Sequence, residues 1–238
     1  MSMTRSRADP RLPVTLLSGF LGAGKTRLLN PTRNNREAED QAAHGGGIDP
    51  HAWQEPANVA LYVARIRDGL IAADPGGEPG YRERAEGYLA ALEALDAETR
   101  TALAGIPPER RKVVTSHDAF GYFAAAYDLV FLAPVGVSTE AEASAADVAA
   151  LIRQIRTEDI PAVFVESIAD PRLLDQIRRE TRAQPGGTLY SDALSPPECP
   201  AATYLDMMRH NLATLVSALA PAGTDPDAGR SQSPQATN

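Results

Sequence analysis

The chain has 238 residues, a formal net charge of −8 and a sequence pI near 5.1. This length allows one large or two modest domains with a buried core, so neither a metal ion nor a disulfide is needed for folding. The acidic balance offers no basic stripe to release phosphate counterions, which argues against nucleic-acid binding, and a single cysteine, Cys199, excludes an internal disulfide or a thiolate metal cluster.

The start of the chain predicts a buried strand followed by a phosphate-binding loop. Residues 12–17 are mostly apolar and lead into GFLGAGKT at residues 19–26, and residues 25–29 fit the first turns of a helix. In such a loop, backbone N–H groups surround a phosphate, the lysine adds a positive charge and the hydroxyl binds magnesium. The candidate nucleotide-binding residues are Gly19, Gly24, Lys25 and Thr26.

The same N-terminal residues do not resemble a secretory signal. Such a signal has a basic start, an uninterrupted apolar run and a small-residue cleavage site, whereas the apolar run here ends at Lys25. No segment has the roughly 20 consecutive apolar residues of a membrane-spanning helix. We therefore expect no cleavable signal and no direct membrane span, which leaves a cytoplasmic location open.

Two helices are predicted in the middle of the chain. A polar junction at residues 31–47 ends in three glycines, and apolar residues then recur at helical spacing over residues 59–70. The Asp-Pro-Gly-Gly group at residues 74–77 ends this first helix. The apolar positions of residues 81–103 predict a second helix of about 35 Å, which is long enough to run along a whole small domain.

The second half of the chain alternates short apolar runs with amphipathic helices. The runs lie at residues 112–115, 129–133, 162–165 and 188–191, and the helices at residues 118–127, from about 145, at 171–181 and at 205–219. This alternation predicts βαβ units around a parallel sheet, which is an α/β fold with helices flanking the sheet. Residues 221–238 have no apolar periodicity, and we expect them to be disordered.

Three potential metal ligands follow predicted strands. His117, Glu166 and Asp192 each come at the end of an apolar run, and ligands of open parallel sheets bind beyond the carboxyl ends of the strands. His51 lies in a proline-containing loop before a helix, so it would approach from another part of the molecule. Imidazole and carboxylate groups are the ligand types that a divalent ion such as zinc prefers.

Each candidate also has a simpler interpretation. Asp192 could cap a turn or a helix start, and Glu166 is expected to lie behind the ligands or to accept hydrogen bonds from nearby backbone. His210, on the last helix, is interpreted as a surface or satisfied core residue. The aromatic residues are expected to pack around the site; they are Trp53, Phe120, Tyr122 and Phe123.

Three short motifs in the sequence resemble motifs of a known family: DPHAW at residues 49–53, HDAFGYF at 117–123 and SDA at 191–193. Residues 46–219 resemble the zinc and manganese solute-binding proteins of bacterial ABC importers, whose two lobes are joined by one long rigid helix. The resemblance implies that His51, His117 and Asp192 bind the metal. It also implies a further histidine nearer the N-terminus, which has no counterpart here. His44 is interpreted as a remnant of the family's histidine-rich loop or as a solvated junction residue rather than as a substitute ligand.

The resemblance implies a binding protein and not an enzyme. It would be the substrate-binding component of a metal ABC importer, with membrane permease subunits as partners, a periplasmic location, and zinc favoured over manganese as the ion. The first lobe would be largely missing, so transport could be impaired. The implied organisation is a P-loop-like fragment at 1–30, a junction at 31–47, a first-lobe remnant with the spine helix at 48–106, a C-terminal α/β metal-binding lobe at 107–220 and a tail at 221–238.

A second resemblance rests on the N-terminal residues alone. Residues 12–26 are similar to the start of the CobW-type GTPases, which implies an alternative function as a nucleotide-dependent metallochaperone that binds GTP if the loop is functional. The chain departs from that family elsewhere. One cysteine excludes a Cys-x-Cys-Cys metal segment, and lysines at positions 25 and 112 alone leave no Asn-Lys-x-Asp segment for guanine recognition.

Overall fold

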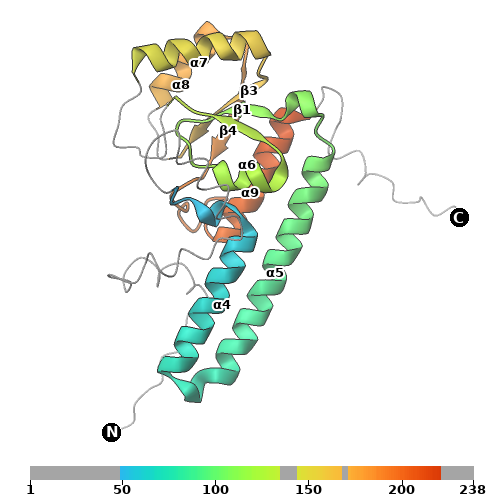
Figure 1. The fold of residues 1–238 in the computed structure, drawn as a ribbon, viewed down its shortest axis with the longest axis vertical. Coiled ribbons are helices and arrows are strands. Elements are labelled where there is room, and N and C mark those ends of the chain that lie inside the picture. The colour runs from blue at the N-terminus through green and yellow to red at the C-terminus, as the bar shows by residue number, and fades with distance from the viewer. Residues whose placement is uncertain (1–48, 135–143, 168–170, 221–238) are drawn as a thin grey trace, which may run out of the picture.

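The structure is a computed structural model that describes residues 49–134, 144–167 and 171–220. The predicted N-terminal strand and phosphate loop, the junction and the C-terminal tail lie outside the described residues. The described part is an α/β lobe from which a hairpin of two long helices projects (Figure 1). None of the described helices is both long and apolar enough to cross a membrane.

The hairpin consists of α4 (Pro56–Ala73) and α5 (Glu78–Ala104), joined by the short 3-10 helix η3 (Pro75–Gly77). Proline at the first position of α4 suits a helix start, since the missing N–H would have no helical acceptor there. With 27 residues, α5 is about 40 Å long. Its C-terminal half packs against the lobe through buried side chains at helical spacing: Leu92, Leu95, Thr99 and Leu103. The predicted spine helix is therefore confirmed.

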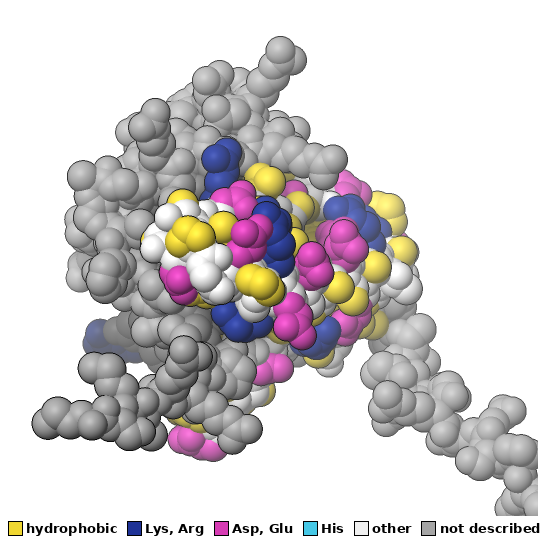
Figure 2. Space-filling view, turned by 90° about the horizontal axis from the view of Figure 1, so that it is seen from below, with side chains coloured by type: hydrophobic (Ala, Val, Ile, Leu, Met, Phe, Trp, Pro, Cys, Tyr) yellow, Lys and Arg dark blue, Asp and Glu magenta, His cyan; other side chains and the backbone are white. Residues whose placement is uncertain are grey.

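The free end of the hairpin is polar and mixed in charge. Seen from below, acidic, basic and apolar side chains are interspersed over it, and no one kind gathers into a patch (Figure 2). Arg82 pairs with Glu78 at 2.7 Å, and Arg67 pairs with Asp68 at 2.8 Å. Exposed pairs of this kind contribute little to stability, so the hairpin is held mainly by its packing on the lobe.

The lobe is built on a parallel sheet, as the alternation of strands and helices predicts. Its strands are β1 (Lys112–Val114), β2 (Val130–Leu132), β3 (Ala162–Glu166) and β4 (Gln184–Leu189), in the order β2-β1-β3-β4. All three pairings are parallel. The α/β fold class is therefore confirmed.

Helices cover both faces of the sheet. On one face lie α7 (Ala145–Glu158) and α8 (Pro171–Glu180), and on the other lie α5, α6 (Gly121–Tyr127) and α9 (Tyr204–Leu219) (Figure 1). Successive strand residues alternate between these faces: Val113 packs in the cluster with α5, α6 and α9, and Val114 in the cluster with α7. Because both faces are covered, the central strands are apolar except for Lys112 at the start of β1 and Glu166 at the end of β3.

The predicted strand at residues 188–191 is wrong at both ends, because β4 runs from Gln184 to Leu189. The Pro-Gly-Gly run argues against a strand in the sequence, but β4 is an edge strand, where proline is tolerated. Gly186 is also required by packing, since a Cβ there would lie 2.4 Å from Cε1 of Phe164. Because β4 ends at Leu189, Ser191 lies in the loop that carries Asp192.

The loop after β1 is longer than predicted. The helix predicted from residue 118 begins at Gly121, because the Ala119 N–H donates to the His117 carbonyl at 3.1 Å and keeps these residues out of the helix. The short 3-10 helices η2 (Ala52–Gln54) and η4 (Pro108–Arg110) precede α4 and β1. Loop residues before η2, after β1 and after β4 thus remain available for the site.

Candidate metal centre

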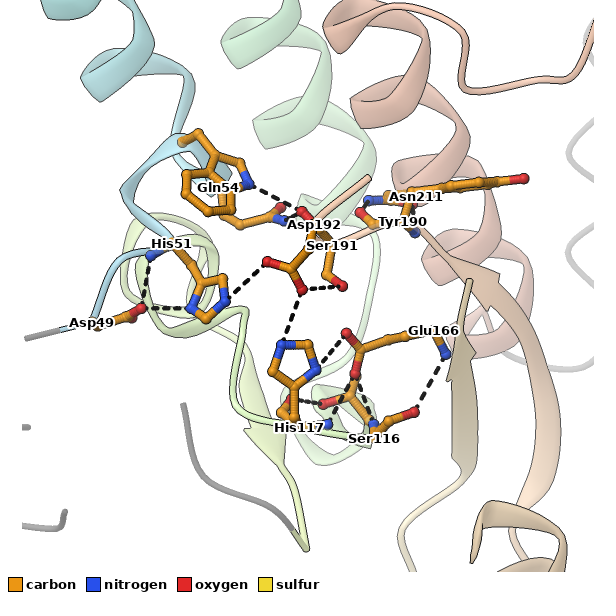
Figure 3. Close-up of polar contacts among 12 residues, drawn as sticks. Asp49, His51, Gln54, Ser116, His117, Glu166, Tyr190, Ser191, Asp192 and Asn211 are labelled. Atoms are coloured by element: carbon orange, nitrogen blue, oxygen red, sulfur yellow. Dashed lines mark hydrogen bonds and ion pairs between the residues drawn. The ribbon is translucent and has the colours of Figure 1, made fainter. Parts of the chain in front are cut away.

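His51 is oriented by the residues next to it. It lies just before η2, and its backbone N–H donates to Oδ1 of Asp49 at 2.9 Å. The same oxygen lies 2.7 Å from His51 Nδ1, so one carboxylate holds both the backbone and the ring. The other ring nitrogen, Nε2, lies 3.1 Å from Oδ1 of Asp192 (Figure 3). His51 is 3% exposed.

His117 is held from the sheet. It lies in the loop after β1, beside Glu166 at the end of the neighbouring strand β3. Oε1 of Glu166 accepts hydrogen bonds from the backbone N–H groups of Ser116 at 2.9 Å and His117 at 3.0 Å. Its Oε2 lies 2.8 Å from His117 Nδ1, and His117 Nε2 lies 3.1 Å from Oδ2 of Asp192 (Figure 3).

Asp192 lies between the two imidazoles, each of its oxygens facing one Nε2 atom. The Ser191 hydroxyl donates to Oδ2 of Asp192 at 3.0 Å. The Ser191 carbonyl accepts two further hydrogen bonds, from Trp53 Nε1 and Gln54 Nε2, each at 3.0 Å. The segment that carries Asp192 is therefore tied to η2, the element that follows His51.

Helix α9 holds the same segment from the other side. The Asn211 side chain accepts from the Tyr190 backbone N–H at 2.9 Å and donates to the Tyr190 carbonyl at 2.7 Å. Tyr204, at the start of α9, donates its hydroxyl to the Trp53 carbonyl at 2.9 Å. Residues 190–192 are thus fixed through their backbone before any ligand contributes.

The three predicted ligands converge on one point. One ligand atom from each of His51, His117 and Asp192 lies within 4.8 Å of the other two. The two rings approach each other edge to face, with centroids 5.4 Å apart. The side chain of Asp192 is 24% exposed while both imidazoles are buried, so solvent reaches the group from the side of the carboxylate.

The site is strongly polarised without a metal ion. Burial by itself lowers the pKa of His51 and of His117, but the carboxylates of Asp192, Asp49 and Glu166 outweigh burial and raise each pKa to about 9. Burial by itself raises the pKa of Asp192, but the contacts with His117 and His51 hold that pKa well below its usual range. A metal ion that binds in place of the imidazole protons would supply the positive charge that those protons provide beside the carboxylates.

The donor set suits a divalent transition metal. Two imidazole Nε2 atoms and a carboxylate oxygen face one another, and each imidazole has a carboxylate beside its Nδ1, an arrangement that orients ligating histidines. His117 Nε2 is buried and, within the part of the chain that the structure describes, makes no hydrogen bond, although Oδ2 of Asp192 lies 3.1 Å away. A buried nitrogen of this kind is costly unless something binds it.

The other candidates have different surroundings. Glu166 lies behind His117, which is one of its two predicted roles, but the backbone N–H groups that it accepts from, those of Ser116 and His117, belong to the loop after β1 and not to its own loop. His210 lies apart from the site and contacts the Thr188 carbonyl at 3.0 Å. Phe120 is a core residue, as expected, whereas Trp53 has the additional role of hydrogen-bond donor. Phe123 is likewise in the core, and Tyr122 is partly buried.

Sequence reasoning did not single out Asp49, Gln54 or Asn211. Asp49 could have been found, since an aspartate two residues before a candidate ligand can hydrogen-bond that residue's backbone. The other two bind backbone groups 137 and 21 residues away, and no local pattern indicates such contacts. The nucleotide candidates Gly19, Gly24, Lys25 and Thr26, together with His44, lie outside the described residues.

Comparison with known proteins supplies an independent result. Residues 6–218 match the ZnuA family, described as zinc-uptake complex component A, periplasmic. The chain is 34% identical over 173 residues to the manganese-binding lipoprotein MntA of Halalkalibacterium halodurans, with 73% of this chain and 58% of MntA covered. It is 30% identical to the metal ABC transporter substrate-binding lipoprotein SsaB of Streptococcus sanguinis, with 74% and 57% covered.

A solved structure agrees with these relatives. The periplasmic zinc-binding protein TroA of Treponema pallidum superposes with a TM-score of 0.72 at 35% sequence identity, over 75% of this chain and 66% of TroA. The chain therefore spans less than two thirds of the length of each of these relatives. None of these comparisons involves a CobW-type GTPase, and the N-terminal resemblance stays a prediction.

Proposed function

The chain belongs to the ZnuA family, and from this premise we propose that it binds a divalent transition-metal ion through His51, His117 and Asp192. The ligand atoms would be Nε2 of each imidazole and a carboxylate oxygen of Asp192. The metal is the cargo of the protein, so the chemistry is capture and release rather than catalysis.

One observation carries this proposal: three ligand atoms, from segments far apart in the sequence, lie within 4.8 Å of one another. Zinc bonds to nitrogen and oxygen are about 2 Å long, so ligand atoms around one tetrahedral ion lie about 3.3 Å apart, and the three atoms here would reach that spacing by closing about 1.5 Å or less. Two imidazoles and one carboxylate favour zinc over manganese, because manganese prefers oxygen ligands.

Zinc titration of the metal-free chain, followed by calorimetry, tests the proposal. We expect one site per chain, with most of the affinity lost in His117→Ala because a ligand is removed. His210→Ala is the matched control, since His210 contacts the Thr188 carbonyl, the Thr214 hydroxyl and the Tyr190 ring but none of the three proposed ligands. Equal binding by the wild type and His117→Ala would refute the assignment. A competition with manganese then tests the preference for zinc.

The wider role follows from the family. We infer a substrate-binding component of a metal ABC importer that acts in the periplasm with membrane permease subunits, in line with the printed names of SsaB and TroA. In this organisation residues 107–220 form the metal-binding lobe, and residues 48–106 contribute the spine helix and His51. The nucleotide-dependent alternative has no support among the comparisons, and no described residue favours it.

A further inference from the structure

One backbone carbonyl joins the two segments that carry His51 and Asp192. The carbonyl of Ser191 accepts from the indole Nε1–H of Trp53 and from the amide Nε2–H of Gln54, both at 3.0 Å. Gln54 is fully buried and Ser191 is 1% exposed, so water does not compete for the bond from Gln54, whereas Trp53 is half-buried. We call this pair of hydrogen bonds the Ser191 strap.

The Ser191 strap joins segments that are far apart in the sequence and that carry two of the proposed ligands. Gln54 and Ser191 are separated by 137 residues, yet each lies within three residues of a proposed ligand. The Tyr204 hydroxyl binds the Trp53 carbonyl at 2.9 Å, so η2 is also fastened to α9. The Trp53 ring lies edge to face with His51, with centroids 5.3 Å apart, which fixes the imidazole against the same element.

We propose that Trp53 and Gln54 are positioning residues, which hold Asp192 opposite His51 through the Ser191 carbonyl before a metal ion binds. The proposal rests on the metal-binding function proposed above. Its physical basis is preorganisation: a site whose ligands are already ordered loses less conformational entropy when the ion arrives. The strap therefore favours binding although neither residue touches the metal.

Because two donors share the Ser191 carbonyl, either hydrogen bond can partly replace the other, and this redundancy can be measured. A carbonyl oxygen has two lone pairs, and here each accepts one hydrogen bond. Removing one donor leaves the Ser191 carbonyl satisfied by the other. Removing both leaves a buried carbonyl without a partner, which costs more than twice the loss of a single bond. The effects of the two substitutions should therefore be far from additive.

A double-mutant cycle tests this redundancy. Gln54→Met removes one donor with little change of shape, Trp53→Phe removes the other together with one ring of the indole, and zinc affinity is measured by competition with a chelator of known affinity. We expect each single variant within about threefold of the wild type and the double variant weaker by more than about tenfold. Tyr127→Phe is the matched control, since it removes one hydroxyl donor, to Asp96 at 2.8 Å, away from the site.

Two results would overturn the strap. A double variant that binds zinc like the wild type shows that the carbonyl does not position Asp192. A double variant whose cobalt-loaded form keeps the wild-type absorption spectrum, and whose loss of affinity matches its loss of folding stability, shows a structural role only. If the wild type itself binds no zinc, the proposed function fails instead, so the two failures are distinguishable.

The wild-type chain provides a second measurement that needs no variant. Trp53 is the single tryptophan in the sequence, so its indole N–H gives one resonance in an 15N spectrum. We expect this proton to exchange slowly with solvent in the metal-free chain and more slowly still with zinc, because binding and strap formation favour each other. Exchange at the rate of a free indole, with or without zinc, would refute the strap.

Discussion

The two imidazoles of the site are held in different ways. His117 depends on Glu166, whose side chain is fully buried at the end of a central strand and bonds two backbone N–H groups as well as facing the ring. His51 depends on Asp49, which is two residues away in the same loop, and whose side chain is 11% exposed. The sheet thus fixes His117, whereas a carboxylate of its own loop orients His51.

Asp192 faces both His51 and His117, so its loss should have the largest effect on zinc affinity. In Asp192→Asn the carboxylate that faces both Nε2 atoms is replaced by a neutral amide, which is a poor metal ligand. We expect zinc affinity to fall by more than about a hundredfold, beyond the range seen for outer residues of metal sites. Calorimetric titration measures it, and a fall of less than tenfold would contradict a shared ligand.

Lower pH should weaken zinc binding because it protonates both imidazoles. Each imidazole has a pKa of about 9 in the metal-free chain, and the metal binds only the neutral form of the ring. Between pH 6 and 8, binding should therefore release close to two protons, and affinity should rise by up to about a hundredfold per pH unit. Calorimetry in buffers of different ionisation enthalpy counts the protons, and binding without proton release would contradict these pKa values.

Substitutions of Glu166 and Asp49, the carboxylates beside the two Nδ1 atoms, test how firmly each imidazole is oriented. Glu166→Gln places an amide N–H opposite His117 Nδ1 while its oxygen keeps the two backbone bonds, so the ring would have to carry its proton on Nε2. We expect zinc affinity to fall by about ten- to a hundredfold. Asp49→Asn should cost less, about tenfold or below, because a partly exposed loop side chain can rotate and water can replace it.

The comparison between these two variants is more informative than either alone. Circular dichroism and thermal unfolding of the metal-free proteins serve as controls for folding. If Asp49→Asn weakens binding more than Glu166→Gln, the sheet-anchored histidine is not the more strongly fixed ligand. Equal effects would mean that both rings are oriented to the same degree, despite their different burial.

Much of the fold could be predicted, because local patterns determine it. The apolar spacing of α4 and α5 and the alternation of strands with helices indicate an α/β lobe with a long helix beside it. The error at β4 has a physical reason: Gly186 looks like a strand breaker in the sequence, and only its contact with Phe164 across the sheet explains it.

The convergence of His51, His117 and Asp192 was predictable in part. Parallel strands bring His117 and Asp192 to one edge of the sheet, but His51 could be placed beside them only through the resemblance to a known family. Glu166 could be predicted to lie behind the ligands because it follows a strand, but its partners and the role of Gln54 could not, because these contacts join residues 49 and 137 positions apart. Such contacts depend on the folded topology and leave no local pattern.

The order of the strands has a consequence for which part of the lobe brings His117 and Asp192 together. β1 and β4 precede His117 and Asp192, yet β3 lies between them, so the strand ends are separated by about 10 Å, two interstrand spacings. Both loops therefore extend over the end of β3, where Glu166 lies, and His117 Nε2 and Asp192 Oδ2 meet at 3.1 Å. The loops, and not the sheet, thus close the distance between imidazole and carboxylate.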